Sequence, residues 1–204
     1  MRSLKVNRTD TPNFHIKLGS GFILLFSLIF FFDDNGFLLA LLPAVLIHEM
    51  GHILIMLLLG AYPTRLNATL SGFAIDYTGI LSDKQELLTA LSGPVFGLLF
   101  SLVCAKLGSF RNSEYLLMCG GLGLILNLFN LLPAMPLDGG RALGFVLRYL
   151  IGESKAQTLA RFISLLTALL LIAWGLYLLA RGFGFALFFA GSWLFILQQN
   201  KYCK

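Results

Sequence analysis

The five residues from His48 to His52 carry the pattern His-Glu-x-x-His inside an apolar run. On a helix this spacing places His48 and His52 on one face, one turn apart, where both imidazoles can reach one metal ion. Glu49 lies about 100° around the helix from His48, which suits holding a metal-bound water better than ligation. Ionisable groups within lipid cost about 2.5–3.5 kcal/mol or more each. A catalytic zinc site would offset that cost, and the alternative is a chance pattern of satisfied core residues.

Composition indicates that the elements around this motif cross a membrane. Hydrophobic residues make up 57% of the 204 residues and charged residues 12%, which is far from the average of soluble domains. The predicted fold class is a membrane, all-α fold with six transmembrane helices and a short β-like segment between the second and third. The six apolar spans are Leu18–Phe32, Gly36–Gly60, Leu87–Leu107, Tyr115–Leu132, Thr158–Ala180 and Phe183–Leu197.

The basic residues predict the orientation of these spans. With the N-terminus inside, the outer segments hold only Lys106, Arg111 and Arg181 of the 15 lysines and arginines. This asymmetry predicts a multi-pass protein of the cell membrane with both termini in the cytoplasm. The net charge of +5 therefore reflects topology and contact with the anionic lipid bilayer. No basic patch interleaved with aromatic residues indicates a nucleic-acid partner.

Two further segments bear on the site. In Arg65–Ser82, apolar residues alternate with small or polar ones around Ser71-Gly72. This pattern predicts two short strands or an irregular hairpin at the cytoplasmic interface, whose exposed edge pairs with an extended peptide; a plain surface loop is the alternative. Ser92-Gly93-Pro94 and Gly97 predict close helix packing and a kink, with a direct role at the site as the alternative.

A catalytic zinc site usually has three protein ligands, so a third is needed. His15 lies among charged residues at the predicted membrane edge and is interpreted as interfacial. Asp138 is the better candidate, because Pro133 and Pro136 break the helix before it and Gly139-Gly140 free the backbone after it. Irregular backbone at this depth fits a water-filled cavity. The alternative is an aspartate that caps the following segment.

The two motifs together resemble those of the site-2 protease family of intramembrane zinc metalloproteases. His48-Glu49-x-x-His52 matches the first family motif, and Asn130-x-x-Pro133-x-x-Pro136-x-Asp138-Gly139 matches the second. The resemblance covers nearly the whole chain in span order. It implies zinc ligation by His48, His52 and Asp138, catalysis by Glu49, and substrate contact by Asn130.

The resemblance also implies a substrate class and a domain organisation. The substrate would be a membrane-anchored protein, such as a transcription regulator precursor or an anti-sigma factor. The chain is similar to the compact six-span prokaryotic form, near the branch that processes sporulation sigma-factor precursors. Residues 1–204 are interpreted as one membrane domain, without room for a PDZ or CBS domain.

The predicted mechanism is zinc-assisted peptide hydrolysis. Zinc is expected to lower the pKa of its bound water toward about 7, while Glu49 takes the proton and passes it to the leaving amine. Two alternatives remain at this point. A membrane metal transporter explains the ligands but leaves Glu49 without a task, and no internal repeat is visible. A non-catalytic membrane scaffold that kept the motif is the other.

Overall fold

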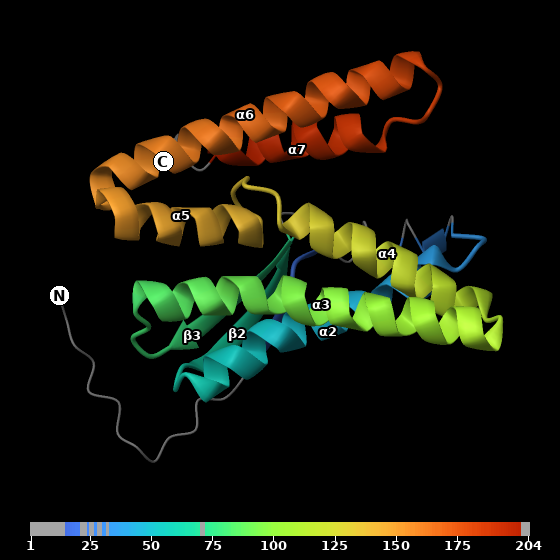
Figure 1. Ribbon diagram of the computed structural model, residues 1–204, viewed down its shortest axis with the longest axis horizontal. Helices are drawn as coiled ribbons and strands as arrows, with labels where there is room; N and C mark the ends of the chain where they lie inside the picture. The colour runs from blue at the N-terminus through green and yellow to red at the C-terminus, as the bar shows by residue number, and fades with distance from the viewer. Residues whose placement is uncertain are drawn as a thin grey trace.

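A computed structural model describes residues 15–20, 24, 27, 30, 31, 33–69 and 72–200. Helices α2, α3 and α4 pack against one another, and the antiparallel pair α6 and α7 lies on the opposite side of α5 (Figure 1). The helices are α2 (Phe37–Leu58), α3 (Asp83–Arg111), α4 (Glu114–Asn130), α5 (Asp138–Ile151), α6 (Glu153–Ala180) and α7 (Ala186–Asn200). The strands are β1 (His15–Leu18), β2 (Tyr62–Thr69) and β3 (Gly72–Thr78).

Within the described part of the chain, three helices are long and apolar enough to cross a membrane. These are α2, α3 and α6, while α4 and α7 are apolar but shorter. The second to sixth predicted spans correspond to α2, α3, α4, α6 and α7. The first, Leu18–Phe32, lies mostly outside the described residues. A mostly helical fold of membrane type with a small sheet is therefore confirmed.

The hairpin predicted within Arg65–Ser82 is present as β2 and β3, which pair antiparallel with Ala68 opposite Phe73. A third strand, β1, was not predicted. It pairs parallel with β2, with His15 opposite Arg65, and gives the order β1-β2-β3. The start of the first span at Leu18 was therefore wrong, because the main chain there pairs in a sheet. In sequence the strand is four residues with one apolar–polar alternation, too short to stand out.

Helix α5 follows directly from the loop after α4. Gly139 and Gly140 lie in its first turn, and neither has a positive φ. The interpretation that these glycines provide backbone freedom was therefore wrong. A Cβ on Gly139 would lie 2.1 Å from the Leu131 carbonyl oxygen, and one on Gly140 would lie 2.5 Å from the Ala134 carbonyl carbon. Both positions need glycine because the loop packs directly against the helix.

Small residues bring α2 and α3 together, as their spacing predicts. A Cβ on Gly51 would lie 2.9 Å from the Ser92 carbonyl oxygen and 3.2 Å from the Gly93 Cα. Backbone therefore meets backbone where the histidine motif faces α3. This close approach fixes α2 against α3 at the level of the candidate site.

Candidate metal centre

Three buried side chains converge on one point. The Asp138 Oδ2 atom lies 3.1 Å from His48 Nε2 and 3.2 Å from His52 Nε2, and the two Nε2 atoms are 3.3 Å apart. Relative exposure is 4% for each histidine and 8% for Asp138. The histidines come from the middle of α2, and Asp138 is the first residue of α5. The structure thus brings together three of the residues that the sequence singled out as ligands.

The spacing of these atoms fits one metal ion. Zinc binds imidazole nitrogen and carboxylate oxygen at about 2.0–2.1 Å, which places tetrahedral ligands about 3.3–3.4 Å apart. The observed separations of 3.1, 3.2 and 3.3 Å match one triangular face of such a tetrahedron. Among the described residues, no fourth histidine, cysteine or carboxylate joins the group. Two imidazoles and one carboxylate are the donor set of a catalytic zinc site with one position left for a non-protein ligand.

Asn127 determines the tautomer of His48. The Asn127 Nδ2 group donates to the Gly123 carbonyl oxygen at 2.7 Å, which orients its Oδ1 toward His48 Nδ1 at 2.8 Å. An amide oxygen only accepts, so we infer that Nδ1 of His48 carries the proton. The Nε2 lone pair is then directed at the shared point. Such partners set the orientation and basicity of metal-binding histidines.

The backbone of α3 does the same for His52. Its Nδ1 lies 2.8 Å from the Thr89 carbonyl oxygen, which again requires a proton on Nδ1 and leaves Nε2 free to ligate. A Cβ on Gly93 would lie 2.2 Å from His52 Nε2. A Cβ on Gly97 would lie 2.1 Å from Asn127 Oδ1. The small residues of α3 therefore permit close packing, and what they pack against is the site itself.

Glu49 is half-buried next to this group. Its carboxylate is close enough to His48, His52, Asp138 and Arg141 for electrostatic interaction. No side-chain hydrogen bond ties Glu49 to another residue in the described part of the chain. Its carboxylate is thus near the three converging atoms without being one of them, as its position on the helix predicts.

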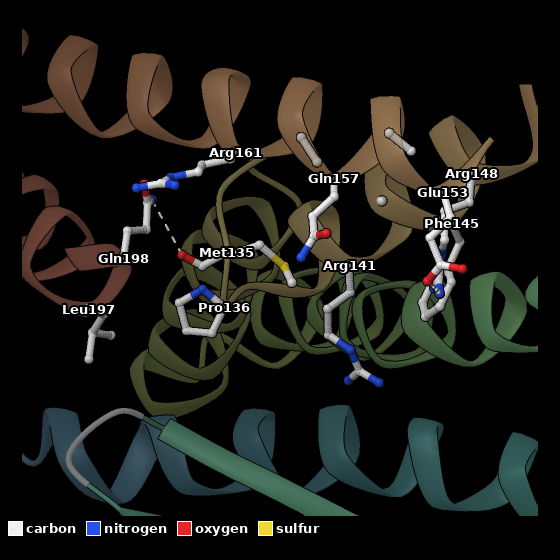
Figure 2. Close-up of a pocket in the computed structure, with 13 residues that line it drawn as sticks. Met135, Pro136, Arg141, Phe145, Arg148, Glu153, Gln157, Arg161, Leu197 and Gln198 are labelled. Atoms are coloured by element: carbon white, nitrogen blue, oxygen red, sulfur yellow. Dashed lines mark hydrogen bonds and ion pairs between the residues drawn. The ribbon is translucent and has the colours of Figure 1, made fainter. Parts of the chain in front are cut away.

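The loop that delivers Asp138 is held from the other side by α6 and α7. The Met135 amide donates to Ser164 Oγ at 2.5 Å, and its carbonyl accepts from Gln198 Nε2 at 3.4 Å. Figure 2 shows Met135 and Pro136 between Gln198 and Arg141, at the edge of a cavity of about 770 Å³. None of the three converging residues lines this cavity. The cavity therefore adjoins the back of the loop and is separate from the candidate metal site.

Comparisons with known proteins find similarity to metalloproteases. The model of Peptidase family M50 matches residues 109–173. The zinc metalloprotease MJ0392 of Methanocaldococcus jannaschii is 28% identical over 141 residues, which are 67% of this chain and 41% of that protein. A solved site-2 protease from Methanocaldococcus jannaschii matches with a TM-score of 0.68 and 24% identity, covering 91% of this chain and 89% of that one. The chain is therefore similar to Peptidase family M50 over part of its length and has the fold of a site-2 protease.

Coverage determines how far each comparison reaches. The chain spans about two fifths of the length of the curated zinc metalloprotease that it matches. The family match begins at residue 109, so it includes Asp138 but neither histidine. The convergence of His48 and His52 on Asp138 is thus a separate observation from that match, and the likeness to the solved site-2 protease shows the fold.

Two predicted residues lie outside the group of ligands, and one unpredicted residue lies inside the site. His15 begins β1, and Asn130 ends α4, half-buried. Neither is among the three converging residues, and substrate contact by Asn130 remains a prediction. Asn127, one helical turn before Asn130, is fully buried and bonds His48. An amide within the apolar part of a helix was the signal for it, since polar groups in lipid usually serve a function.

Proposed function

We propose that this protein is a member of the site-2 protease family and an intramembrane zinc metalloprotease. It would hydrolyse peptide bonds in or near transmembrane segments of membrane-anchored proteins, such as precursors of transcription regulators. The observation that carries the proposal is the convergence of two buried imidazoles and a carboxylate within 3.1–3.3 Å of one another. Their placement beside the half-buried Glu49 of an apolar helix supports catalysis. His48, His52 and Asp138 would hold the zinc ion.

The proposed mechanism assigns one proton transfer path to the chain. When bound, zinc supplies Lewis acidity, which acidifies a water and polarises the scissile carbonyl. Glu49 accepts the proton of the attacking water and donates it to the leaving amine. Asn127 and the Thr89 carbonyl hold the imidazoles in the Nδ1–H tautomer, so both Nε2 atoms stay available throughout the reaction.

Strand β3 is proposed to hold the substrate. A transmembrane helix must unwind before cleavage, because its own hydrogen bonds shield the carbonyls. In the sheet order β1-β2-β3, one edge of β3 has no partner strand among those described. An unwound substrate would pair along this edge, and Asn130 would contact it near the site. Ile75→Pro should therefore slow cleavage of a helical substrate and of an extended peptide, while zinc content stays unchanged. Wild-type rates on both substrates would reduce β3 to a connecting element.

Six spans with both termini in the cytoplasm complete the proposal. Five apolar helices support it, three of them long enough to cross a membrane, together with the basic asymmetry of the connecting segments. Reporters fused after Asp34, near Arg111 and near Arg181 should be external. Fusions near Asp76, near Glu153 and at the C-terminus should be cytoplasmic. An external C-terminus would contradict the six-span topology.

The decisive experiment compares wild type with Glu49→Gln in zinc content and in cleavage of a membrane-anchored substrate. Both proteins should bind one equivalent of zinc, and only wild type should cleave. His48→Ala, His52→Ala and Asp138→Ala should each lose zinc and activity. Cleavage by Glu49→Gln at the wild-type rate would contradict the role of Glu49. Full zinc binding by Asp138→Ala would place the third ligand elsewhere.

A further inference from the structure

A continuous series of polar contacts runs from the sheet to the candidate ligand Asp138. One carboxylate oxygen of Asp138, Oδ2, faces both histidines. The other, Oδ1, lies 3.8 Å from the Arg141 guanidinium, one turn further along α5. The second amino group of Arg141 lies 4.0 Å from Glu86 Oε2 in the first turn of α3. Glu86 Oε1 in turn accepts a hydrogen bond from the Tyr77 hydroxyl of β3.

These contacts link β3, α3, α5 and α2 in series, and Arg141 lies between the two carboxylates. The Asp138 and Glu86 side chains are 11% and 18% exposed, whereas the Arg141 side chain between them is 36% exposed. A guanidinium can engage two carboxylates at once because its donors lie in a rigid plane. Glu86 therefore pairs with the side of Arg141 that does not face Asp138.

We propose that Arg141 is a positioning residue for Asp138, and that Glu86 and Tyr77 hold it in place. This inference rests on the metal site proposed above. A carboxylate can turn about its Cβ–Cγ bond. The positive charge of Arg141 beside one oxygen favours the orientation in which the other oxygen meets the two imidazoles. Residues that orient a metal ligand in this way typically contribute about 10–100-fold to metal affinity or activity.

Arg148 provides a matched control. It lies two turns beyond Arg141 on the same helix, with a side-chain exposure of 35%. It too pairs with the first turn of α3, through Asp83 at 3.6 Å. Arg148 also pairs with Glu153 at 4.0 Å, and neither of its partners is a candidate ligand. If arginines of α5 act only by fastening that helix to α3, Arg141 and Arg148 should be equivalent.

The experiment measures zinc affinity by chelator competition in wild type, Arg141→Gln, Arg141→Lys and Arg148→Gln of the full chain in detergent. Arg141→Gln should bind zinc about 10–100-fold more weakly, Arg141→Lys should recover part of the loss, and Arg148→Gln should match wild type. Glu86→Gln should weaken binding less than Arg141→Gln. In the double variant, the Glu86 change should add no further loss, because the two residues act in series.

Wild-type affinity in Arg141→Gln, or an equal loss in Arg148→Gln, would overturn the inference. The absorption spectrum of bound Co²⁺ gives a second measurement if Arg141→Gln does not fold. Arg141→Lys should then shift the spectrum relative to wild type, because the geometry at Asp138 changes, and an unchanged spectrum would also overturn the inference. A wild-type protein that binds no zinc at all would instead contradict the proposed function.

Discussion

Helices α2–α4 and helices α5–α7 contribute to the candidate site in different ways. In the first region, the backbones of α2 and α3 meet at Gly51 and Ser92. Of the most apolar stretch of α3, 44% is buried inside the molecule. In the second region the corresponding share is 17% for α6, and a cavity of about 770 Å³ separates parts of α5, α6 and α7. The histidines come from the first region, whereas Asp138 comes from the second, after a loop that borders this cavity.

This difference indicates that the ligands are fixed by different means. The orientations of His48 and His52 follow from helix packing and from hydrogen bonds to Asn127 and Thr89. The position of Asp138 depends on the loop before it, in which the amide and the carbonyl of Met135 are hydrogen-bonded to Ser164 and Gln198. Substitutions around the histidines should therefore act on metal binding more strongly than those that hold the loop before Asp138.

The largest effect is expected at Gly93. In Gly93→Ala the new methyl group would lie 2.2 Å from His52 Nε2, so His52 must leave the metal position. The loss of zinc affinity and of proteolysis should exceed the about 10–100-fold typical of a lost ligand partner. Gly121→Ala is the control, because a Cβ there meets nothing within 4 Å. Equal zinc content in both variants would show that the first region is not tightly packed around the site.

Asn127 and Asn130 should differ although they are one turn apart on α4. Asn127→Ala removes the acceptor of the His48 Nδ1 proton and should lower zinc affinity about 10–100-fold. Asn130→Ala should leave zinc affinity unchanged and raise KM, in line with its predicted contact to substrate. Metal titration and steady-state kinetics separate the two outcomes. A zinc defect in Asn130→Ala would contradict this division of roles.

A smaller effect is expected in the second region. Ser164→Ala leaves the Met135 amide without its acceptor, and an unsatisfied buried donor costs about 1–3 kcal/mol. Most of this cost should appear as a lower unfolding temperature, with less than about a tenfold loss of zinc affinity, since Gln198 still holds the loop. Thr158→Ala is a suitable control, because its hydroxyl bonds an exposed turn of the same helix. A zinc defect as large as that of Asn127→Ala would mean that both regions constrain the site equally.

The smallest effect is a pH dependence at Tyr77, where β3 meets α3. Burial, the hydrogen bond to Glu86 and the charge of Glu86 raise the pKa of Tyr77 from 10.0 to about 12. The stabilisation from this contact is therefore full below pH 10 and is lost as the pH rises through about 12. The difference in unfolding temperature between wild type and Tyr77→Phe should shrink across that window. A constant difference would show that the Tyr77 proton is not involved.

The features predicted correctly from the sequence are those with a strong local signal. His48 and His52 could be assigned to one helix face because helical geometry leaves no other arrangement. The hairpin β2–β3 follows from alternation around Ser71-Gly72. The separation of about 90 residues between the motifs could be bridged only through the family resemblance, since no local rule brings Asp138 to α2.

The features that were missed depend on tertiary contacts. Strand β1 has too few residues to form a pattern and is stabilised by its partner β2. Gly139 and Gly140 were assigned to backbone freedom, whereas their requirement comes from a loop several residues earlier in the chain. Asn130 was named from the family motif and Asn127 was not predicted, because its role depends on packing against Gly97 and His48.

The placement of ligands in both regions has a consequence for cooperativity. His52 and Asp138 are 86 residues apart in the chain, and a bound metal would link them as a covalent cross-link does. With metal, the two regions should unfold as one cooperative unit. After chelation, α5–α7 should unfold at a lower temperature than α2–α4, so that calorimetry records two transitions where the metal-bound protein shows one.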